Sequence, residues 1–103
     1  MESIRDNMDW SIKVTEDFIK ELKKRGIYKR IKKALDDLEE MLRKDPYGTV
    51  RMLYHNPIIF SVGEYPARRY SIGKYRLFYI ILPGERLIVF FDIKPRRKAY
   101  KKK

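Results

Sequence analysis

The spacing of apolar residues in the first half of the chain predicts one strand followed by two helices. Residues 9–14 alternate between polar and apolar side chains, as in a strand with one buried face. Thr15 follows as a helix N-cap, and apolar residues three and four positions apart continue towards Gly26. The same spacing predicts a longer helix over residues 27–44. The sequence Asp-Pro-Tyr-Gly at residues 45–48 is expected to end that helix.

Alternating aliphatic and aromatic residues dominate the second half and predict strands. The expected strands are residues 68–72, 75–82 and 87–93. Residues 50–57 are expected to be irregular. Gly73-Lys74 and Pro83-Gly84 are tight-turn sequences, so the strands form two consecutive antiparallel hairpins. The pattern therefore predicts an α+β fold, in which two N-terminal helices pack on one face of a small twisted antiparallel sheet.

The first hairpin decides which side chains share a face of this sheet. A two-residue turn at Gly73-Lys74 places Ser71 opposite Arg76. The same register places Arg69 on that face, opposite Phe78, and a slip of one residue would turn Arg76 away. The other face then carries Arg68, Tyr70, Ile72, Tyr75, Leu77 and Tyr79. If the second turn is centred on Pro83-Gly84, Phe91 lies opposite Arg76, so aromatic rings frame the two arginines.

The net charge of +11 is unevenly divided along the chain. Residues 1–48 carry 12 Lys and Arg against 11 Asp and Glu, whereas residues 49–103 carry 13 against 3. A cationic surface built from one half of a chain predicts a polyanionic partner, an acidic partner protein, or both. The alternative is a generally basic protein whose surface serves solubility alone.

The composition limits the size, location and chemistry of the protein. A single domain is expected over residues 1–103, with flexible ends at 1–8 and 101–103. Neither a signal peptide nor an apolar run long enough to span a membrane is present, which favours the cytoplasm. The absence of cysteine excludes disulfides and thiol chemistry. The absence of glutamine beside abundant Lys, Arg and Glu favours a thermophilic source.

The cationic face is suited to RNA. Arginine binds phosphate through two parallel hydrogen bonds, and aromatic rings stack on exposed bases. Fixed cations also stabilise the charge that develops on phosphate when a 2′-hydroxyl attacks it, so phosphate binding with and without cleavage both fit. No cofactor or metal ion is expected.

Proton transfer is harder to assign, because the chain has one histidine, His55, which is expected in a surface loop. Tyr100 is the preferred candidate, since neighbouring cations would stabilise its phenolate. Glu64 is a further candidate base, although a salt bridge to Arg68 or Arg69 is the preferred interpretation.

Two segments resemble the RelE/ParE toxin superfamily, and archaeal RelE-like toxins in particular. The first is Arg69-Tyr-Ser-Ile-Gly73-Lys-Tyr75-Arg76-Leu-Phe-Tyr79, and the second is Ile93-Lys-Pro-Arg96-Arg97-Lys-Ala-Tyr100. The resemblance covers about residues 9–100. It implies a RelE-like fold and the toxin of a type II toxin–antitoxin pair. Such a toxin is a ribosome-dependent endoribonuclease that cleaves mRNA and stops translation, and an acidic RelB-like antitoxin holds it in check.

The resemblance also implies roles for individual residues. Arg76 matches the arginine that stabilises the scissile phosphate, and Arg69 matches the first basic position of the hairpin. Arg96 matches the arginine after the last strand, with Arg97 as the alternative. Tyr100 matches the tail tyrosine associated with stacking or proton transfer. The residues expected to bind RNA are Arg68, Lys74, Arg97 and Lys98.

One position departs from the superfamily pattern. Ser71 stands where a second basic residue is common. Either Arg68 compensates for this departure, or cleavage is weakened, which leaves open a toxin fold that acts as a binding module. A ParE-like inhibitor of DNA gyrase, which shares the fold without being a nuclease, is the other alternative.

Overall fold

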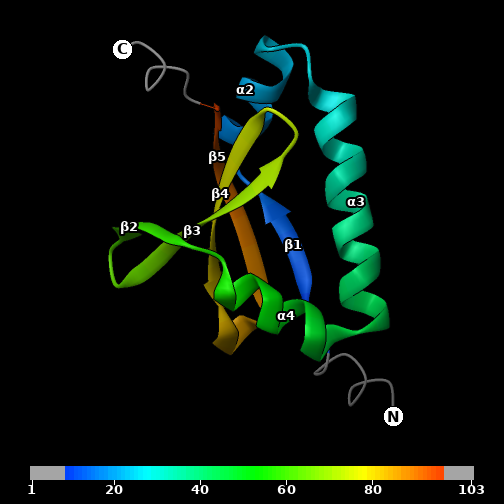
Figure 1. The fold of residues 1–103 in the computed structure, drawn as a ribbon, viewed down its shortest axis with the longest axis vertical. Coiled ribbons are helices and arrows are strands. Elements are labelled where there is room, and N and C mark those ends of the chain that lie inside the picture. The colour runs from blue at the N-terminus through cyan, green and yellow to red at the C-terminus, as the bar shows by residue number, and fades with distance from the viewer. Residues whose placement is uncertain (1–8, 97–103) are drawn as a thin grey trace.

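The computed structural model describes residues 9–96, which form one five-stranded mixed sheet and three helices (Figure 1). The elements in chain order are β1 (Ser11–Val14), α2 (Glu16–Lys24), α3 (Tyr28–Lys44), α4 (Pro46–His55), β2 (Ile58–Val62), β3 (Tyr65–Ile72), β4 (Tyr75–Leu82), the 3-10 turn η1 (Pro83–Glu85) and β5 (Leu87–Pro95). Strands in the sheet are ordered β1-β5-β4-β3-β2. The α+β class is confirmed. The expectation of flexible ends falls on residues outside 9–96.

Helices α2 and α3 follow the apolar spacing of the sequence. The Thr15 hydroxyl accepts a hydrogen bond from the Phe18 amide at 3.2 Å and so caps α2. Gly26, with φ at +72°, ends that helix in a conformation that favours glycine. The buried residues of α3 are Ile31, Leu35, Leu38 and Leu42. Among described residues, no helix is long and apolar enough to cross a membrane.

Helix α4 corrects the expectation that residues 50–57 are irregular. The Asp45 carboxylate accepts a hydrogen bond from the Gly48 amide at 3.0 Å, and Pro46 occupies the first turn. The Asp-Pro-Tyr-Gly sequence therefore ends α3 and begins α4 at once. Thr49 and Leu53 of α4 are buried, so tertiary packing favours a helix that the sequence alone does not predict.

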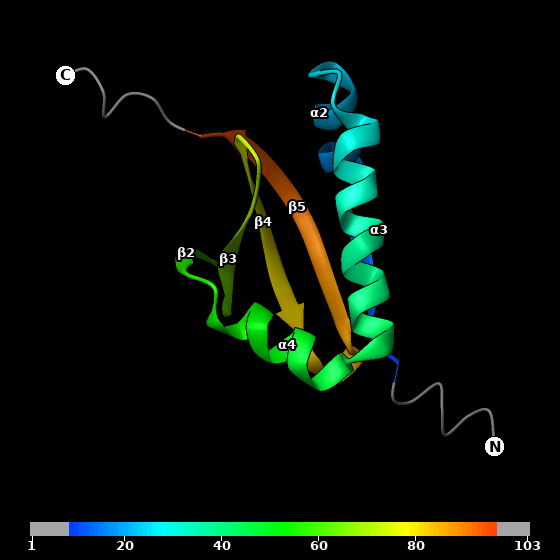
Figure 2. The ribbon, with the colours of Figure 1, turned by 45° about the vertical axis from the view of Figure 1, so that its right-hand side comes forward.

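The helices and the sheet enclose one core. Figure 2 shows α3 running alongside the sheet and α4 crossing its lower end. The strand residues buried against the helices are Leu77, Tyr79, Ile81, Ile88, Phe90 and Ile93. Because side chains alternate along a strand, their neighbours in β3, β4 and β5 point to the face that the helices leave uncovered. We call this second surface the outer face.

The sheet has two strand pairs that the sequence did not predict. β1 pairs with β5 in parallel, so the sheet is mixed, whereas the other neighbours are antiparallel. β2 forms a hairpin with β3 through a turn at Gly63, where φ is +63°. All five residues of β2 are exposed, as suits a short strand at the edge of a sheet.

The register of β4 against β5 differs from the prediction, and the reason lies in the connection. The expected two-residue turn is longer: residues 83–86 connect Leu82 to its partner Leu87. An irregularity at Phe78/Tyr79 adds a further residue to β5. Lys94, and not Phe91, therefore lies opposite Arg76.

Candidate functional site

Arg76 lies at the centre of a cationic cluster on the outer face. Its neighbour on β3 is Ser71 and its neighbour on β5 is Lys94. Arg69 lies diagonally across from Arg76, because it pairs with Phe78. Directly opposite residues are about 5 Å apart and diagonal ones about 7–8 Å, so these long side chains can reach one ligand. The prediction that Arg69 and Arg76 share one uncovered face is confirmed, and both are half-buried.

The turn between β3 and β4 extends this cluster along the sheet. The Arg96 amide donates to the Lys74 carbonyl at 2.6 Å, which places the start of the C-terminal tail beside the turn. Lys74 and Arg96 are both exposed. The predicted roles of Arg97, Lys98 and Tyr100 concern residues that the structure does not describe.

Arg30 is a cation of this region that sequence analysis missed. Gly73 has φ at +56°, and the Arg30 guanidinium occupies the space that a Cβ atom on Gly73 would need. Arg30 belongs to the first turn of α3, within the near-neutral half of the chain. A signal was present in the sequence, because Arg30 has no acidic residue three or four positions away. Lys32 and Lys33, in contrast, pair with acids four residues on.

Arg68, predicted to bind RNA, is separated from Arg69 and Arg76. Its guanidinium donates to the Asn56 carbonyl at 2.9 Å and lies 5.6 Å from the centre of the Tyr54 ring. These contacts lie on the side of the sheet that packs against α4. Arg68 therefore joins α4 to the sheet rather than extending the cationic cluster.

The acidic residues and the histidine take structural positions. Asp92 lies 3.6 Å from the Lys94 ammonium and also accepts from the Ile93 amide at 2.8 Å. The expected salt bridge from Glu64 to an arginine is not formed among residues 9–96, and Glu64 is exposed in the β2–β3 turn. His55 Nδ1 lies 2.8 Å from the Arg51 carbonyl at the end of α4.

The tyrosines on the helix-covered side are less suited to act as bases than an exposed tyrosine. Burial raises the pKa of Tyr79 to about 12, and it also raises the pKa of Tyr70. The Tyr79 hydroxyl donates to the Leu53 carbonyl at 2.7 Å and accepts from the Asn56 amide at 3.0 Å. Both rings lie on the helix-covered side. Within the described residues, the outer face thus offers cations for phosphate binding and charge stabilisation.

Aromatic rings flank the cluster, as the sequence predicted, although with a different arrangement. The Phe60 ring lies 5.6 Å from that of Phe78 and 6.1 Å from that of Phe91. Phe91 reaches the outer face through the irregularity in β5 and packs against β2.

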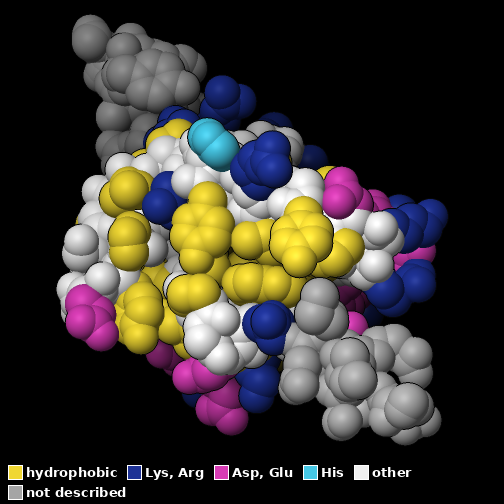
Figure 3. Space-filling view, turned by 90° about the horizontal axis from the view of Figure 1, so that it is seen from below, with side chains coloured by type: hydrophobic (Ala, Val, Ile, Leu, Met, Phe, Trp, Pro, Cys, Tyr) yellow, Lys and Arg dark blue, Asp and Glu magenta, His cyan; other side chains and the backbone are white. Residues whose placement is uncertain are grey.

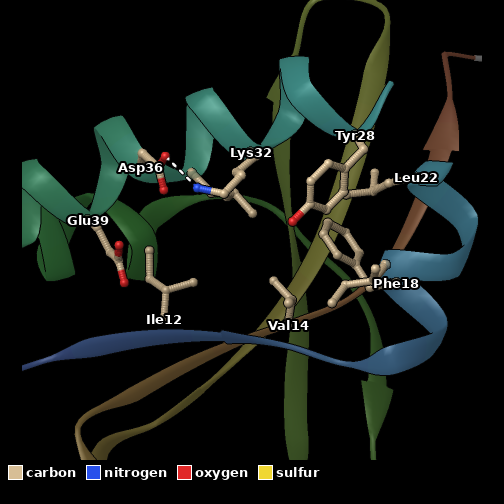
Figure 4. Close-up of a pocket in the computed structure, with 10 residues that line it drawn as sticks. Ile12, Val14, Phe18, Leu22, Tyr28, Lys32, Asp36 and Glu39 are labelled. Carbon is tan, nitrogen blue, oxygen red and sulfur yellow. Dashed lines mark hydrogen bonds and ion pairs between the residues drawn. The ribbon is translucent and has the colours of Figure 1, made fainter. Parts of the chain in front are cut away.

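A groove on the opposite side of the molecule is a poorer candidate. Figure 4 shows Ile12 and Val14 of β1 facing Tyr28 and Lys32 of α3 across an apolar space of about 170 Å³. The Lys32 ammonium bonds to Asp36 at 3.0 Å, and this pairing raises the pKa of Lys32. The space is smaller than the roughly 300–1,000 Å³ of typical ligand pockets. No group of side chains suited to a metal ion occurs among residues 9–96.

The structure defines a small α+β protein with a cationic surface on the face of its sheet that the helices leave uncovered. A family model for the ParE toxin of the type II toxin–antitoxin system parDE matches residues 10–100. The chain therefore belongs to this family, within the RelE/ParE superfamily.

The structure is also similar to the crystal structure of the archaeal RelE–RelB complex from Pyrococcus horikoshii OT3. The TM-score is 0.58 at 22% sequence identity, over 89% of this chain and 100% of that chain. At 22% sequence identity, this similarity shows that the two proteins share a fold and nothing more. No curated protein sequence matches the chain significantly.

Proposed function

We propose that this toxin is a ribosome-dependent endoribonuclease that cleaves mRNA and stops translation. The observation that carries the proposal is the placement of Arg69, Arg76 and Lys94 on one uncovered face of the sheet. Lys74 and Arg96 lie where that face meets the turn. Together they form a cationic surface onto which a strand of RNA can be laid.

The chemistry follows from the position of Arg76. When the 2′-hydroxyl attacks the adjacent phosphate, negative charge gathers on the phosphoryl oxygens. A half-buried arginine whose strand neighbours are Ser71 and Lys94 can meet that charge, and one such donor is worth about 10²- to 10³-fold in rate. Arg69 and Arg96 bind the flanking phosphates. Tyr100 transfers a proton or stacks on a base, and Arg97 and Lys98 add contacts to RNA.

The controlling partner in this proposal is an acidic, RelB-like antitoxin. The similar archaeal RelE was crystallised in complex with RelB. An acidic segment that follows the outer face would meet Arg69, Arg76 and Lys94, with Lys74 and Arg96 where that face meets the turn. The same surface then serves mRNA and antitoxin in turn, and the toxin acts in the cytoplasm, where ribosomes are found.

Substitution of Arg76 tests the proposal. We expect Arg76→Ala to abolish growth arrest on induced expression, because the variant loses the cation at the scissile phosphate. The fold should remain intact, since Arg76 is half-buried on an uncovered face. The matched control is Arg43→Ala, which removes an exposed cation of α3 that pairs with Glu40. Primer extension on mRNA after induction should show cleavage within codons for wild type and Arg43→Ala only. Undiminished cleavage by Arg76→Ala would contradict the role of Arg76.

Inhibition of DNA gyrase is a second candidate, favoured by the match to the ParE toxin model. Purified wild-type protein in a gyrase supercoiling assay separates the two functions. Inhibited supercoiling together with intact mRNA would replace the endoribonuclease proposal. If neither activity is found, the protein acts as a binding module, the outcome that Ser71 leaves open.

A further inference from the structure

A second surface combines aromatic rings with arginines, at the other end of the sheet from Gly73. It is a hollow of about 510 Å³ where α4, η1 and the start of β1 meet. β4 runs from the Gly73-Lys74 turn to η1 over eight residues, so the two sites are roughly 23 Å apart. Figure 3 views the molecule from this end and shows hydrophobic side chains gathered at its centre, with Lys and Arg beside them and acidic side chains further out.

Helix α4 presents one face to this hollow. Tyr47, Val50, Arg51 and Tyr54 recur three and four residues apart, whereas Thr49 and Leu53 point into the core. Tyr47 is 75% exposed and Tyr54 is 40% exposed. Neighbouring large rings are seldom left exposed on the same helix surface, and the half-buried Trp10 adds a third ring to this cluster.

The charge of the hollow has one sign. Its charged residues are Arg51 and Arg86, and neither forms an ion pair with any residue between 9 and 96. Guanidinium groups without an acidic partner beside apolar rings favour a ligand that is both anionic and flat or apolar.

The backbone at Arg86 supports a role for its side chain. Arg86 has φ at +52°, in the left-handed region that glycine adopts at little cost and other residues rarely enter. Its carbonyl accepts from the Ser11 amide at 3.0 Å and its amide donates to the Pro83 carbonyl at 3.2 Å, so both ends of the residue are fixed. Glycine would adopt this backbone conformation at a lower energetic cost. The presence of arginine at this position therefore points to a role for its side chain.

We propose that this hollow binds a nucleotide of single-stranded RNA, with the base stacked on Tyr47 or its neighbouring rings and the phosphate held by Arg51 and Arg86. Its volume lies within the range of small-molecule sites. An extended peptide would use the open backbone of an edge strand, whereas the walls here are a helix and a turn that present side chains. Ring faces beside guanidinium groups match the two halves of a nucleotide. The inference rests on the proposed function in taking RNA as the ligand, but it does not require cleavage.

The test measures binding of a short fluorescent oligouridylate by anisotropy, with every variant made on the Arg76→Ala background so that the RNA stays intact. We expect Tyr47→Ala and Arg86→Gly each to weaken binding about fivefold or more, the lower end of what losing one stacked base costs. The controls Tyr65→Ala and Arg43→Ala remove an exposed ring and an exposed cation elsewhere, and should change binding less than about twofold.

Two further readouts separate recognition from folding. Arg86→Gly relieves the backbone at residue 86, so its thermal unfolding temperature should not fall while RNA binding does. Ultraviolet crosslinking of the oligouridylate should label peptides containing Trp10, Tyr47 or Tyr54.

The inference is overturned if both variants bind RNA within twofold of their parent, or if crosslinks are confined to β3–β5. Binding of an acidic aromatic peptide that Tyr47→Ala abolishes, with RNA binding unchanged, would make the hollow a peptide site and also overturn it. Neither result bears on cleavage, which Arg76→Ala tests separately in the otherwise wild-type protein.

Discussion

Tyr79 shows how a single residue supports the site from the covered side of the sheet. Its ring is fully buried, and its hydroxyl bonds to Leu53 and Asn56 at the end of α4. Arg68 bonds to the same end of α4 through the Asn56 carbonyl. These contacts attach the end of α4 to β3 and β4, on the face of the sheet opposite to that of Arg69 and Arg76.

The substitution Tyr79→Phe should therefore destabilise the protein at neutral pH. It removes the donor to the Leu53 carbonyl and the acceptor of the Asn56 amide, and buried groups left without partners cost about 1–3 kcal/mol. Urea unfolding at pH 7 measures the loss. Tyr65→Phe is the control, because Tyr65 is 37% exposed and should change stability by less than about 0.5 kcal/mol.

Alkaline pH should destabilise the wild-type protein through the same residue. The pKa of Tyr79 is about 12 in the folded state against about 10 in the unfolded chain, so the folded state keeps its proton longer. The stability that this difference provides is complete below pH 10 and is lost as the pH rises through 12. Urea unfolding at a series of alkaline pH values should show a decline that is steeper for wild type than for Tyr79→Phe. Equal declines would contradict the assignment to Tyr79.

At the level of residues, the sequence was informative where local geometry decides the outcome. Strand alternation and the short Gly73-Lys74 turn were enough to place Arg69 and Arg76 on one face. Arg68 was assigned to RNA by its charge, although the same alternation places it on the opposite face. Arg30 was missed because its proximity to Gly73 depends on how α3 packs, which no local pattern encodes.

Among the elements, α4 was the main one that the sequence did not predict. Gly48, Thr49 and Val50 are weak helix formers, so the segment resembles a loop. Burial of Thr49 and Leu53 overrides that preference. The register of β5 against β4 also depends on features beyond the local pattern. Because of the connection through η1 and the added residue near Phe91, Lys94 lies opposite Arg76.

The cap of α4 gives a prediction at this scale. Asp45→Ala should lower the free energy of unfolding by about 1 kcal/mol, because the Gly48 amide loses its side-chain acceptor at the helix start. Asp37→Ala is the matched control, since Asp37 is exposed and lies 3.5 Å from the Lys33 ammonium, a pair worth little. Urea unfolding of both variants measures the change in the free energy of unfolding that each substitution causes. An equal effect of the two substitutions would show that the cap contributes nothing.

At the scale of the whole molecule, the uneven distribution of charge along the sequence becomes an uneven distribution of charge in the folded protein. The strands that carry the outer face come from the half with 13 Lys and Arg and 3 Asp and Glu, whereas Asp36, Asp37 and Glu40 of α3 are paired with lysines and arginines of that helix. The α+β class and the cationic sheet could therefore be predicted, but the mixed sheet could not. Strand order depends on contacts between residues far apart in sequence, here β1 with β5.

Binding of single-stranded RNA should accordingly depend strongly on salt. If Arg69, Arg76, Lys94 and Arg96 each neutralise one phosphate, the logarithmic slope of affinity against salt is about −2.8. Affinity should then fall about 50-fold between about 50 and 200 mM salt. Fluorescence anisotropy measures it. Lys94→Ala should make the slope shallower by about 0.7, whereas Arg43→Ala should leave it unchanged, and a slope near zero would exclude electrostatic binding.

The parallel pairing of β1 with β5 has a consequence for synthesis of the toxin. β5 is the last of the strands within residues 9–96 to leave the ribosome, yet it lies inside the sheet between β1 and β4. Until it emerges, the first strand has no partner and the core residues Ile88, Phe90 and Ile93 are missing. Lys94, which stands beside Arg76, arrives equally late. A chain without β5 therefore lacks both part of the core and a cation of the outer face, so the same strand completes the fold and the cationic cluster.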